Sequence, residues 1–245
     1  MSATLAFALK TAPDVAGLRR LTNLPARMSD HDVAEYAMQR RRASHGCDAL
    51  APHVQRIVAI AGVWHDGPHI RLMSLAVPAL SEAQILQRFF DDIEHTRPQL
   101  ASWQAQRVDL PVLHMRALIH GVAAPHYWAA GVAPVHLSEE TVGAVERVAV
   151  IDLAATLAPA AHEPAPLAEL AGLIGLPAHM LAAAPTPAAA CEIEAVLTHV
   201  VMRRLAVLRG DIDPSALARE LAVLRGLLRQ APGVHWQDFL AAWPE

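Results

Sequence analysis

The stretch Ser102–Gly121, SWQAQRVDLPVLHMRALIHG, decides the fold expected for this chain. A short apolar strand over Leu100–Trp103 leads into it. Pro111 suits the first turn of the following helix, where its missing N–H would be unpaired in any case. Asp109 stands just before that helix, and a carboxylate there can accept backbone N–H bonds as an N-terminal cap. The stretch therefore predicts a strand, a turn and a helix.

Apolar runs and turn signals predict the elements before this stretch. Asp66-Gly67 lies between two β-rich runs and predicts a hairpin. Ser81 with Gln84 predicts a helix start, because the two residues have capping-box spacing. The expected elements are a strand over 3–9, a helix over Ser29–Ala43 with Asp32 and Glu35 spaced as a capping box, strands over Arg56–Trp64 and His69–Ala76, and a helix over Ser81–Glu94.

The second half of the chain reads as mostly helical. Periodicity is weak over 123–143, and helices are expected beyond it, over Arg147–Leu157, Leu167–Leu176, Pro187–Arg209, Pro214–Gln230 and Trp236–Trp243. The order strand, helix, hairpin, helix, strand, helix fits an α/β fold, an open mixed sheet with helices packed on both faces. We expect one domain over 1–245, with a helical part from about residue 150.

Composition restricts the class of protein. The chain has 53% apolar and 18% charged residues, yet it contains no apolar run of about 18 residues, so no membrane span is expected. The N-terminus lacks the pattern of an export signal, which predicts a cytoplasmic protein. Cys47 and Cys191 are far apart, which predicts neither a zinc site nor a disulfide, and buried small side chains are the simplest interpretation.

The formal net charge of −4 argues against a strongly cationic nucleic-acid binder, although a local basic groove stays possible. Arg19-Arg20 and Arg40-Arg41-Arg42 are the densest basic clusters, and solvated helix faces explain them most simply. The 14 histidines show no HExxH or similar metal-binding spacing. No nucleophile elbow of a serine hydrolase is present either.

The opening stretch resembles the second motif of the predicted 3'-5' exonucleases related to the proofreading domain of family-B DNA polymerases. That motif reads approximately S-W-N-G-x-x-F-D-L-P-V-L-x-x-R-A-L, and Gln104, Ala105 and Val108 replace its Asn, Gly and Phe. Four further segments resemble the family in the same order, namely LAFALKTAPD, LAPHVQRIVAIAGVWHDG, ILQRFFDDIE and HWQDFLAAWPE. The resemblance implies a single RNase H-like domain of the DEDD type.

Enzymes of this class hold two divalent cations, Mg²⁺ or Mn²⁺, with carboxylates from the first strand, the second motif and a late helix. The resemblance implies that Asp109 is the one ligand kept by identity. It places Ala8 and Lys10 where the first strand has Asp and Glu. In the late motif, Ala190 replaces the tyrosine that orients the attacking water and Glu194 replaces the aspartate.

The replacements leave alternatives open. Lys10, the only lysine, would repel a divalent ion about 4 Å away by several kcal/mol at an effective dielectric near 20, or it could extend into solvent. Asp109 could be only a helix cap, and Glu192 and Glu194 only a polar helix start. Asp152 resembles an aspartate of another family segment and could be a capping or packing residue.

The sequence favours a degenerate, catalytically inactive member that serves as a nucleic-acid-binding or scaffolding module. Single-stranded nucleic acid or another protein is the expected partner, and neither a metal cofactor nor a membrane is expected. The expected nucleic-acid contacts are Trp103, Gln104 and Arg107. One alternative is an active exonuclease that uses Mg²⁺ or Mn²⁺ with Asp109, Glu194 and either Asp152 or Asp14. The other is a protein-interaction module formed by the helices after residue 150.

Overall fold

The computed structural model describes residues 3–129, 150–158 and 164–243. Its sheet has the strand order β3-β2-β1-β4-β5, in which β2 pairs antiparallel with β1 and β3, while β4 runs parallel to both β1 and β5. The strands are β1 (Thr4–Pro13), β2 (Gln55–Asp66), β3 (His69–Ala76), β4 (Gln99–Ser102) and β5 (Val150–Asp152).

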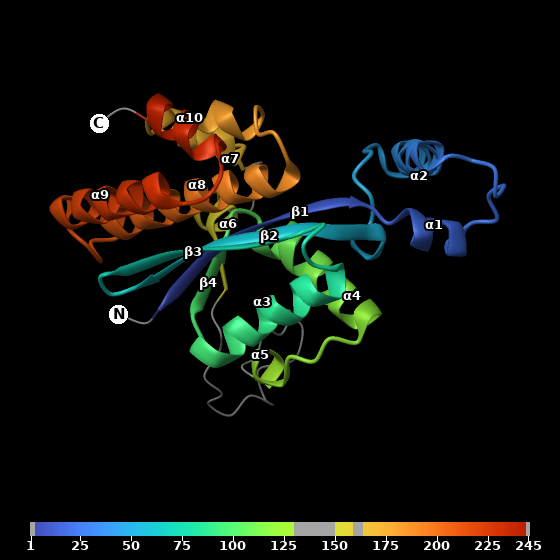
Figure 1. Cartoon of the computed structure of the whole chain (residues 1–245), viewed down its shortest axis with the longest axis horizontal. Coiled ribbons are helices and arrows are strands. Elements are labelled where there is room, and N and C mark those ends of the chain that lie inside the picture. Colours follow the sequence, from blue (N-terminus) through green and yellow to red (C-terminus); the bar gives the residue numbers. More distant parts are fainter. Residues whose placement is uncertain (1–2, 130–149, 159–163, 244–245) are drawn as a thin grey trace.

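Helices cover both faces of this sheet (Figure 1). One face carries α3 (Glu82–Thr96), α4 (Leu110–His120) and α5 (Pro125–Ala129). The other carries α8 (Pro187–Leu208) together with α6 (Leu153–Leu157), α7 (Leu167–Leu173), α9 (Pro214–Gln230) and α10 (His235–Ala242). Short helical turns are η1 (Pro52–Val54), η2 (Ala105–Asp109) and η4 (Ala178–Leu181). The expected mixed α/β sheet with helices on both faces is confirmed, and its topology is RNase H-like.

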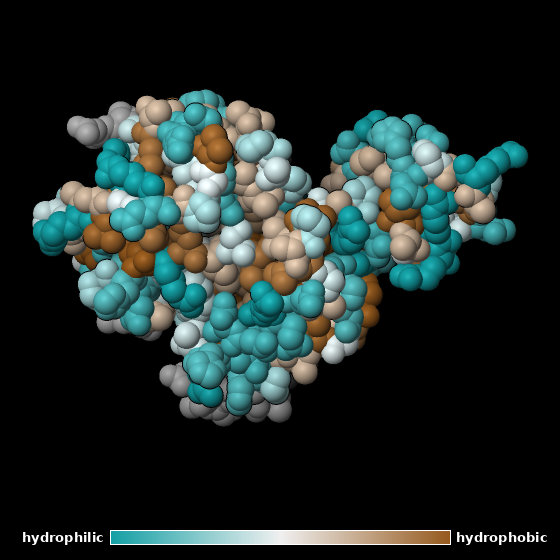
Figure 2. All heavy atoms as spheres, in the orientation of Figure 1, coloured by the Kyte–Doolittle hydropathy of each residue, from teal (hydrophilic) through white to brown (hydrophobic). Residues whose placement is uncertain are grey.

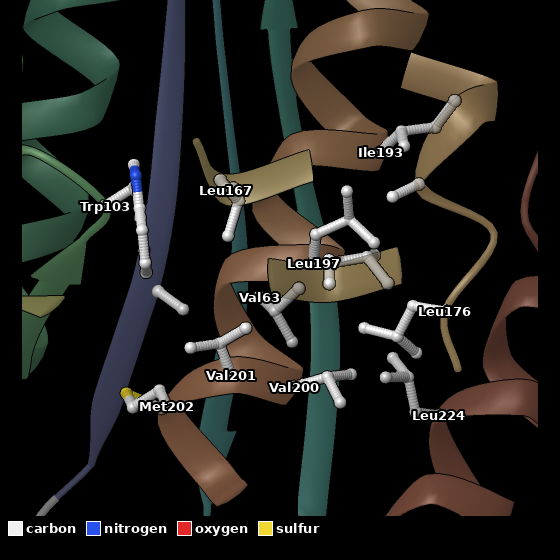
Figure 3. Packing of buried hydrophobic residues seen from close by; sticks show 14 of the residues in the cluster. Val63, Trp103, Leu167, Leu176, Ile193, Leu197, Val200, Val201, Met202 and Leu224 are labelled. Carbon is white, nitrogen blue, oxygen red and sulfur yellow. The ribbon is translucent and has the colours of Figure 1, made fainter. Parts of the chain in front are cut away.

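Alternation along β1 divides the core into two layers. Leu5, Phe7 and Leu9 pack against α3 and α4, while Ala6 belongs to the layer under α8. Successive side chains of a strand point to opposite faces, so small residues on one face let the long helix α8 approach the sheet closely. Figure 3 shows the α8 layer, where Val63 of β2 meets Leu197 and Val200 of α8.

Several local predictions are confirmed. β2 and β3 form the hairpin expected around Asp66-Gly67, and Gly67 adopts the positive φ of 56° that such a turn requires. Ser81 and Gln84 form the predicted capping box at the start of α3.

No helix in the described residues is long and apolar enough to cross a membrane.

Other boundaries were wrong for identifiable reasons. The helix predicted from Arg147 begins only at Leu153, because Val150–Asp152 pair with β4 as an edge strand; residues 147–149 lie outside the described part. The cap of α2 (Asp30–His45) is Ser29, whose hydroxyl accepts the Asp32 N–H, so the Asp32–Glu35 spacing does not mark the start.

Residues 14–54, called here the helical arm, connect β1 to β2 and project to one side of the sheet (Figure 1). The arm contains α1 (Val15–Leu21), which the sequence analysis missed, then α2 and η1. Leu18, Val33 and Val54 form its small core.

A buried arginine joins the base of the arm to the sheet and to two of the helices on one face. Arg116 of α4 is only 2% exposed. Its guanidinium donates two hydrogen bonds to Glu82 of α3, at 2.7 and 2.6 Å, and one of 2.8 Å to Asp14 at the end of β1. It also donates to the His53 carbonyl at 3.0 Å, and Glu82 in turn accepts the Ile57 N–H of β2 at 2.7 Å. One side chain therefore fixes four elements relative to one another.

Replacing this arginine should be among the most damaging single changes to stability. Arg116→Met leaves Asp14 and Glu82 buried without their cation, and breaking a buried ion pair from one side typically costs about 3–5 kcal/mol. Urea unfolding measures the change, and Arg88→Met on the exposed face of α3 is the matched control, expected within about 0.5 kcal/mol of wild type. A loss below about 1 kcal/mol for Arg116→Met would show that the network is dispensable.

Candidate functional site

Three elements that are far apart in sequence meet at the candidate site. Lys10 lies near the end of β1, Asp109 ends η2 after β4, and Glu194 lies on α8, which packs across β1 and β2. The register between β1 and β2 shifts just after Lys10, which pairs with Ala59 whereas Thr11 pairs with Ile57. Such bulges redirect a side chain locally and are frequent beside functional sites.

The Lys10 ammonium forms an ion pair with the Glu194 carboxylate. The two side chains are 29% and 23% exposed, so the pair is shielded from bulk water but not sealed. Lys10 thus does not extend into solvent as one interpretation of the sequence allowed. Glu194, the acid on the late helix, is therefore neutralised by Lys10. Lys10 comes from the first strand, where the family resemblance implies two more acids.

The neighbouring strand position is closed by methyl groups. Ala8 is 3% exposed and packs in a small cluster with Ala59, Ala61, Cys191 and Ala195. Cys191 donates its thiol proton to the Ala8 carbonyl at 3.2 Å, and burial raises the pKa of that thiol far above its usual range. Cys191 is therefore the buried small residue that was expected.

Cys47 was also expected to be buried, and that expectation was wrong. It lies exposed after the end of α2, in a segment where the arm packs little apolar surface.

Asp109 does not cap α4. Its backbone is helical, and its carboxylate makes no hydrogen bond to the N–H groups of that helix. Instead the Ser102 hydroxyl of β4 donates to Asp109 at 2.6 Å. The cap interpretation fails because η2 is a π-type turn, in which the Val108 and Asp109 N–H groups both point to the Gln104 carbonyl, at 2.9 and 3.4 Å. Single π turns recur at functional sites, where they change the direction of a side chain.

Burial raises the pKa of Asp109 to about 7, although the hydrogen bond from Ser102 lowers it. The negative charges of Glu194 and Asp152 push the pKa in the same direction, while the Lys10 ammonium lowers it. Asp109 therefore keeps its proton to a higher pH than an exposed aspartate does. Ser102 was not singled out from the sequence, although its place in the S-W pair of the second motif was a usable signal.

The other acids have structural partners. Asp152 caps α6 by accepting the Ala155 N–H at 2.9 Å, and it also accepts the Gln106 N–H of η2 at 2.9 Å, which confirms the capping interpretation. Asp14 belongs to the Arg116 network at the base of the arm.

Glu192 reaches neighbouring elements and is more than a polar helix start. It accepts a 2.5 Å hydrogen bond from the Ser74 hydroxyl of β3. Its carboxylate also lies 2.9 Å from Nε2 of His235 in α10, an ion-pair distance without hydrogen-bond alignment. Glu194 likewise has a tertiary partner in Lys10, so neither acid is explained by the helix dipole alone.

The three residues suggested as nucleic-acid contacts differ in exposure. Trp103 is 8% exposed and its ring lies in the α8 layer of the core (Figure 3), so packing occupies its faces. Gln104 is half-buried and begins η2, whereas Arg107 is exposed on that turn. Of the three, only Arg107 is exposed.

The residues present do not fit the pair of divalent ions that the family resemblance implies. Magnesium and manganese require several free oxygen ligands. Glu194 is already paired with Lys10, Asp109 accepts the Ser102 hydroxyl, and Ala8 supplies only a methyl group. Within the described residues, no group of three or more His, Cys, Asp and Glu side chains is arranged to hold a metal ion.

Asp109 should reduce stability at alkaline pH. Its folded pKa of about 7 lies above the usual aspartate pKa of 3.8 taken for the unfolded chain, so the folded state holds a proton that the unfolded state loses between those values. Stability from this group is complete below pH 4 and is lost as pH rises through 7. Asp109→Asn should therefore raise the free energy of unfolding by on the order of 2 kcal/mol above pH 8, and by little at pH 4.

Urea unfolding over pH 4–9 measures this effect. Asp91→Asn, on the exposed face of α3, is the control, and it should leave the pH profile unchanged. Equal profiles for wild type and Asp109→Asn would contradict the raised pKa.

Comparison of the sequence with curated proteins gives no match. A family does match: the predicted 3'-5' exonucleases related to the exonuclease domain of PolB, over residues 48–183, which is more than half of the chain. The matched part includes β4, η2 and α4 with Asp109, whereas β1 with Ala8 and Lys10, and α8 with Glu194, lie outside it. By its second motif, its sheet topology and this match, the chain belongs to the family of predicted 3'-5' exonucleases related to the exonuclease domain of PolB.

Proposed function

We propose that this protein is a 3'-5' exonuclease-like module that does not hydrolyse nucleic acid and instead binds it or acts as a scaffold. The observation that carries the proposal is the ion pair between Lys10 and Glu194. In this pair the Lys10 ammonium, a monovalent cation, lies beside Glu194 of the late motif. Family members with the complete motif would instead bring several acids together there around divalent ions.

Electrostatics support the loss of hydrolysis. A divalent ion near Glu194 would have to displace the Lys10 ammonium or tolerate it a few ångströms away, which costs several kcal/mol even at an effective dielectric near 20. The first strand offers no acid in compensation, because Ala8 is a buried methyl group. Asp109 alone would then have to hold the ion, and it is itself bound by Ser102.

Binding of an anion is supported by Arg107, which is exposed on η2, the turn that ends at Asp109. The Lys10 charge is already paired with Glu194. Phosphate contacts from such cations are independent of base sequence and weaken steeply as salt rises. Single-stranded nucleic acid is the partner that the family relationship favours.

An assay with end-labelled single-stranded DNA and RNA, in Mg²⁺ or Mn²⁺, tests the absence of hydrolysis. Wild type should release no mononucleotides, while gel-shift binding of the same oligonucleotides should fall with added salt. Metal-dependent mononucleotide release that disappears in Asp109→Ala would overturn the proposal.

Lys10 can be tested separately through metal affinity. Lys10→Met should free Glu194 and raise the affinity for Mn²⁺ at least about tenfold, because the ammonium repulsion disappears. Isothermal titration calorimetry measures the affinity, and Lys10→Arg, which keeps the charge, should behave like wild type. Equal Mn²⁺ affinity for Lys10→Met and wild type would show that the ion pair is not the cause of weak metal binding.

A working exonuclease with a rearranged set of acids is the second candidate. The observation in its favour is that Glu194 and Asp152 both act electrostatically on Asp109, so three carboxylates lie in one region. Mn²⁺ held jointly by Asp109 and Glu194 in a soaked crystal would favour this candidate, whereas an intact Lys10–Glu194 pair under the same conditions would favour the first.

Protein binding through the C-terminal helices is the third candidate. Large exposed apolar side chains there are Leu173, Leu208, Val223 and Val234, spread over several segments. Single exposed apolar residues are ordinary on soluble proteins, so they give this candidate little support.

A further inference from the structure

The helical arm contains a groove that the exonuclease-like site does not use. The groove has a volume of about 510 Å³ and lies between α1, α2 and the segment leading into β2. This volume is within the usual range of about 300–1,000 Å³ for binding pockets. Its apolar lining includes Leu18, Leu21, Leu24, Val33, Leu50 and Val54. Figure 2 shows apolar surface on the arm surrounded by hydrophilic residues.

α2 is long but has few packing partners. It has 16 residues, of which only Val33 is fully buried, whereas the 15-residue helix α3 buries six. Helices in proteins are stabilised mainly by tertiary packing of an apolar face. Tyr36 of α2 is 41% exposed and Leu21 of α1 is 65% exposed, and both line the groove. Apolar side chains therefore stay open to solvent on both sides of it.

The charges at the groove have one sign. Arg40, Arg41, His45 and His53 line it, and no Asp or Glu is among its lining residues. The neighbouring arginines of the arm are engaged elsewhere, since Arg19 pairs with Asp30 and Arg42 with Asp48. Among the described residues, no ion pair within 4 Å involves Arg40, which is exposed. The groove is thus locally basic on a chain whose net charge is −4.

From these observations we propose that the groove binds an acidic amphipathic helix of a partner protein. Aliphatic side chains on one side of the helix, spaced i, i+3 or i+4, and i+7, would enter the apolar floor. Acidic side chains flanking them would meet Arg40 and Arg41. Charge complementarity at the rim gives orientation and specificity, and burial of the apolar residues gives affinity.

The lining argues against single-stranded nucleic acid as the occupant. Nonspecific binding of single strands depends on aromatic side chains on which bases stack. Tyr36 is the only Phe, Trp or Tyr among the lining residues, whereas six of them are Leu or Val. A helix with leucine-like side chains matches this floor better than planar bases do.

Peptide selection on the immobilised full chain tests the proposal, with a displayed library of random 16-residue peptides as the probe. Selected peptides should be rich in Asp and Glu and carry large apolar residues at helical spacing. A synthetic copy of the best peptide should bind at least about tenfold more weakly to Arg40→Glu and to Leu21→Glu, as measured by fluorescence anisotropy. Both positions are exposed, so neither change disturbs the core.

Arg88→Glu on α3 is the matched control, since it makes the same charge change on an exposed helix face away from the arm, and it should bind the peptide like wild type. Equal binding to wild type, Arg40→Glu and Leu21→Glu would place the peptide elsewhere and overturn the proposal. Selection of basic peptides, or of none, would do the same. A labelled oligo-dT whose binding is lost in Arg40→Glu would overturn it in favour of nucleic acid.

Discussion

The buried guanidinium of Arg116 is the interaction on which the arrangement of this protein depends. It ties together the end of β1, α3, α4 and the base of the helical arm through Asp14, Glu82 and the His53 carbonyl. A charge buried to this degree is tolerable only when its partners are complete. Burial acts to raise the pKa values of Asp14 and Glu82, but hydrogen bonds outweigh it and lower both. For Asp14 these bonds come from the Gly17 N–H and then from Arg116, and for Glu82 they come first from Arg116. The frame of the candidate site is therefore held by charges outside it.

The separation between the Arg116 network and the candidate site explains which parts of the family pattern the chain keeps. Asp14, His53 and Arg116 belong to segments that resemble the family, and all three contribute to the same buried network. By resemblance, Ala8, Lys10 and Ala190 stand where the family has two acids and a phenol. None of the three takes part in the Arg116 network, and packing and catalysis can use different side chains in one fold.

Much of the fold followed from local pattern. The hairpin at Asp66-Gly67, the capping box of α3 and the long helices α8 and α9 are each predicted by residues close together in the sequence. β5 was missed because three residues carry no periodicity, and only pairing with β4 makes them a strand. The cap interpretation of Asp109 failed for a similar reason, since the π turn before α4 follows from the packing of η2 and leaves no trace in residue spacing.

The sequence by itself determined that Ala8 and Lys10 stand where the family resemblance places two acids, since that depends only on residue identity and order. It also determined the alternation of β1 and the length of α8. Only the tertiary structure decided that Lys10 pairs with Glu194, 184 residues away, and that Ser102 binds Asp109. These contacts exist because α8 crosses β1 while β4 runs beside it, and the geometry of three packed elements cannot be read from spacing along one chain.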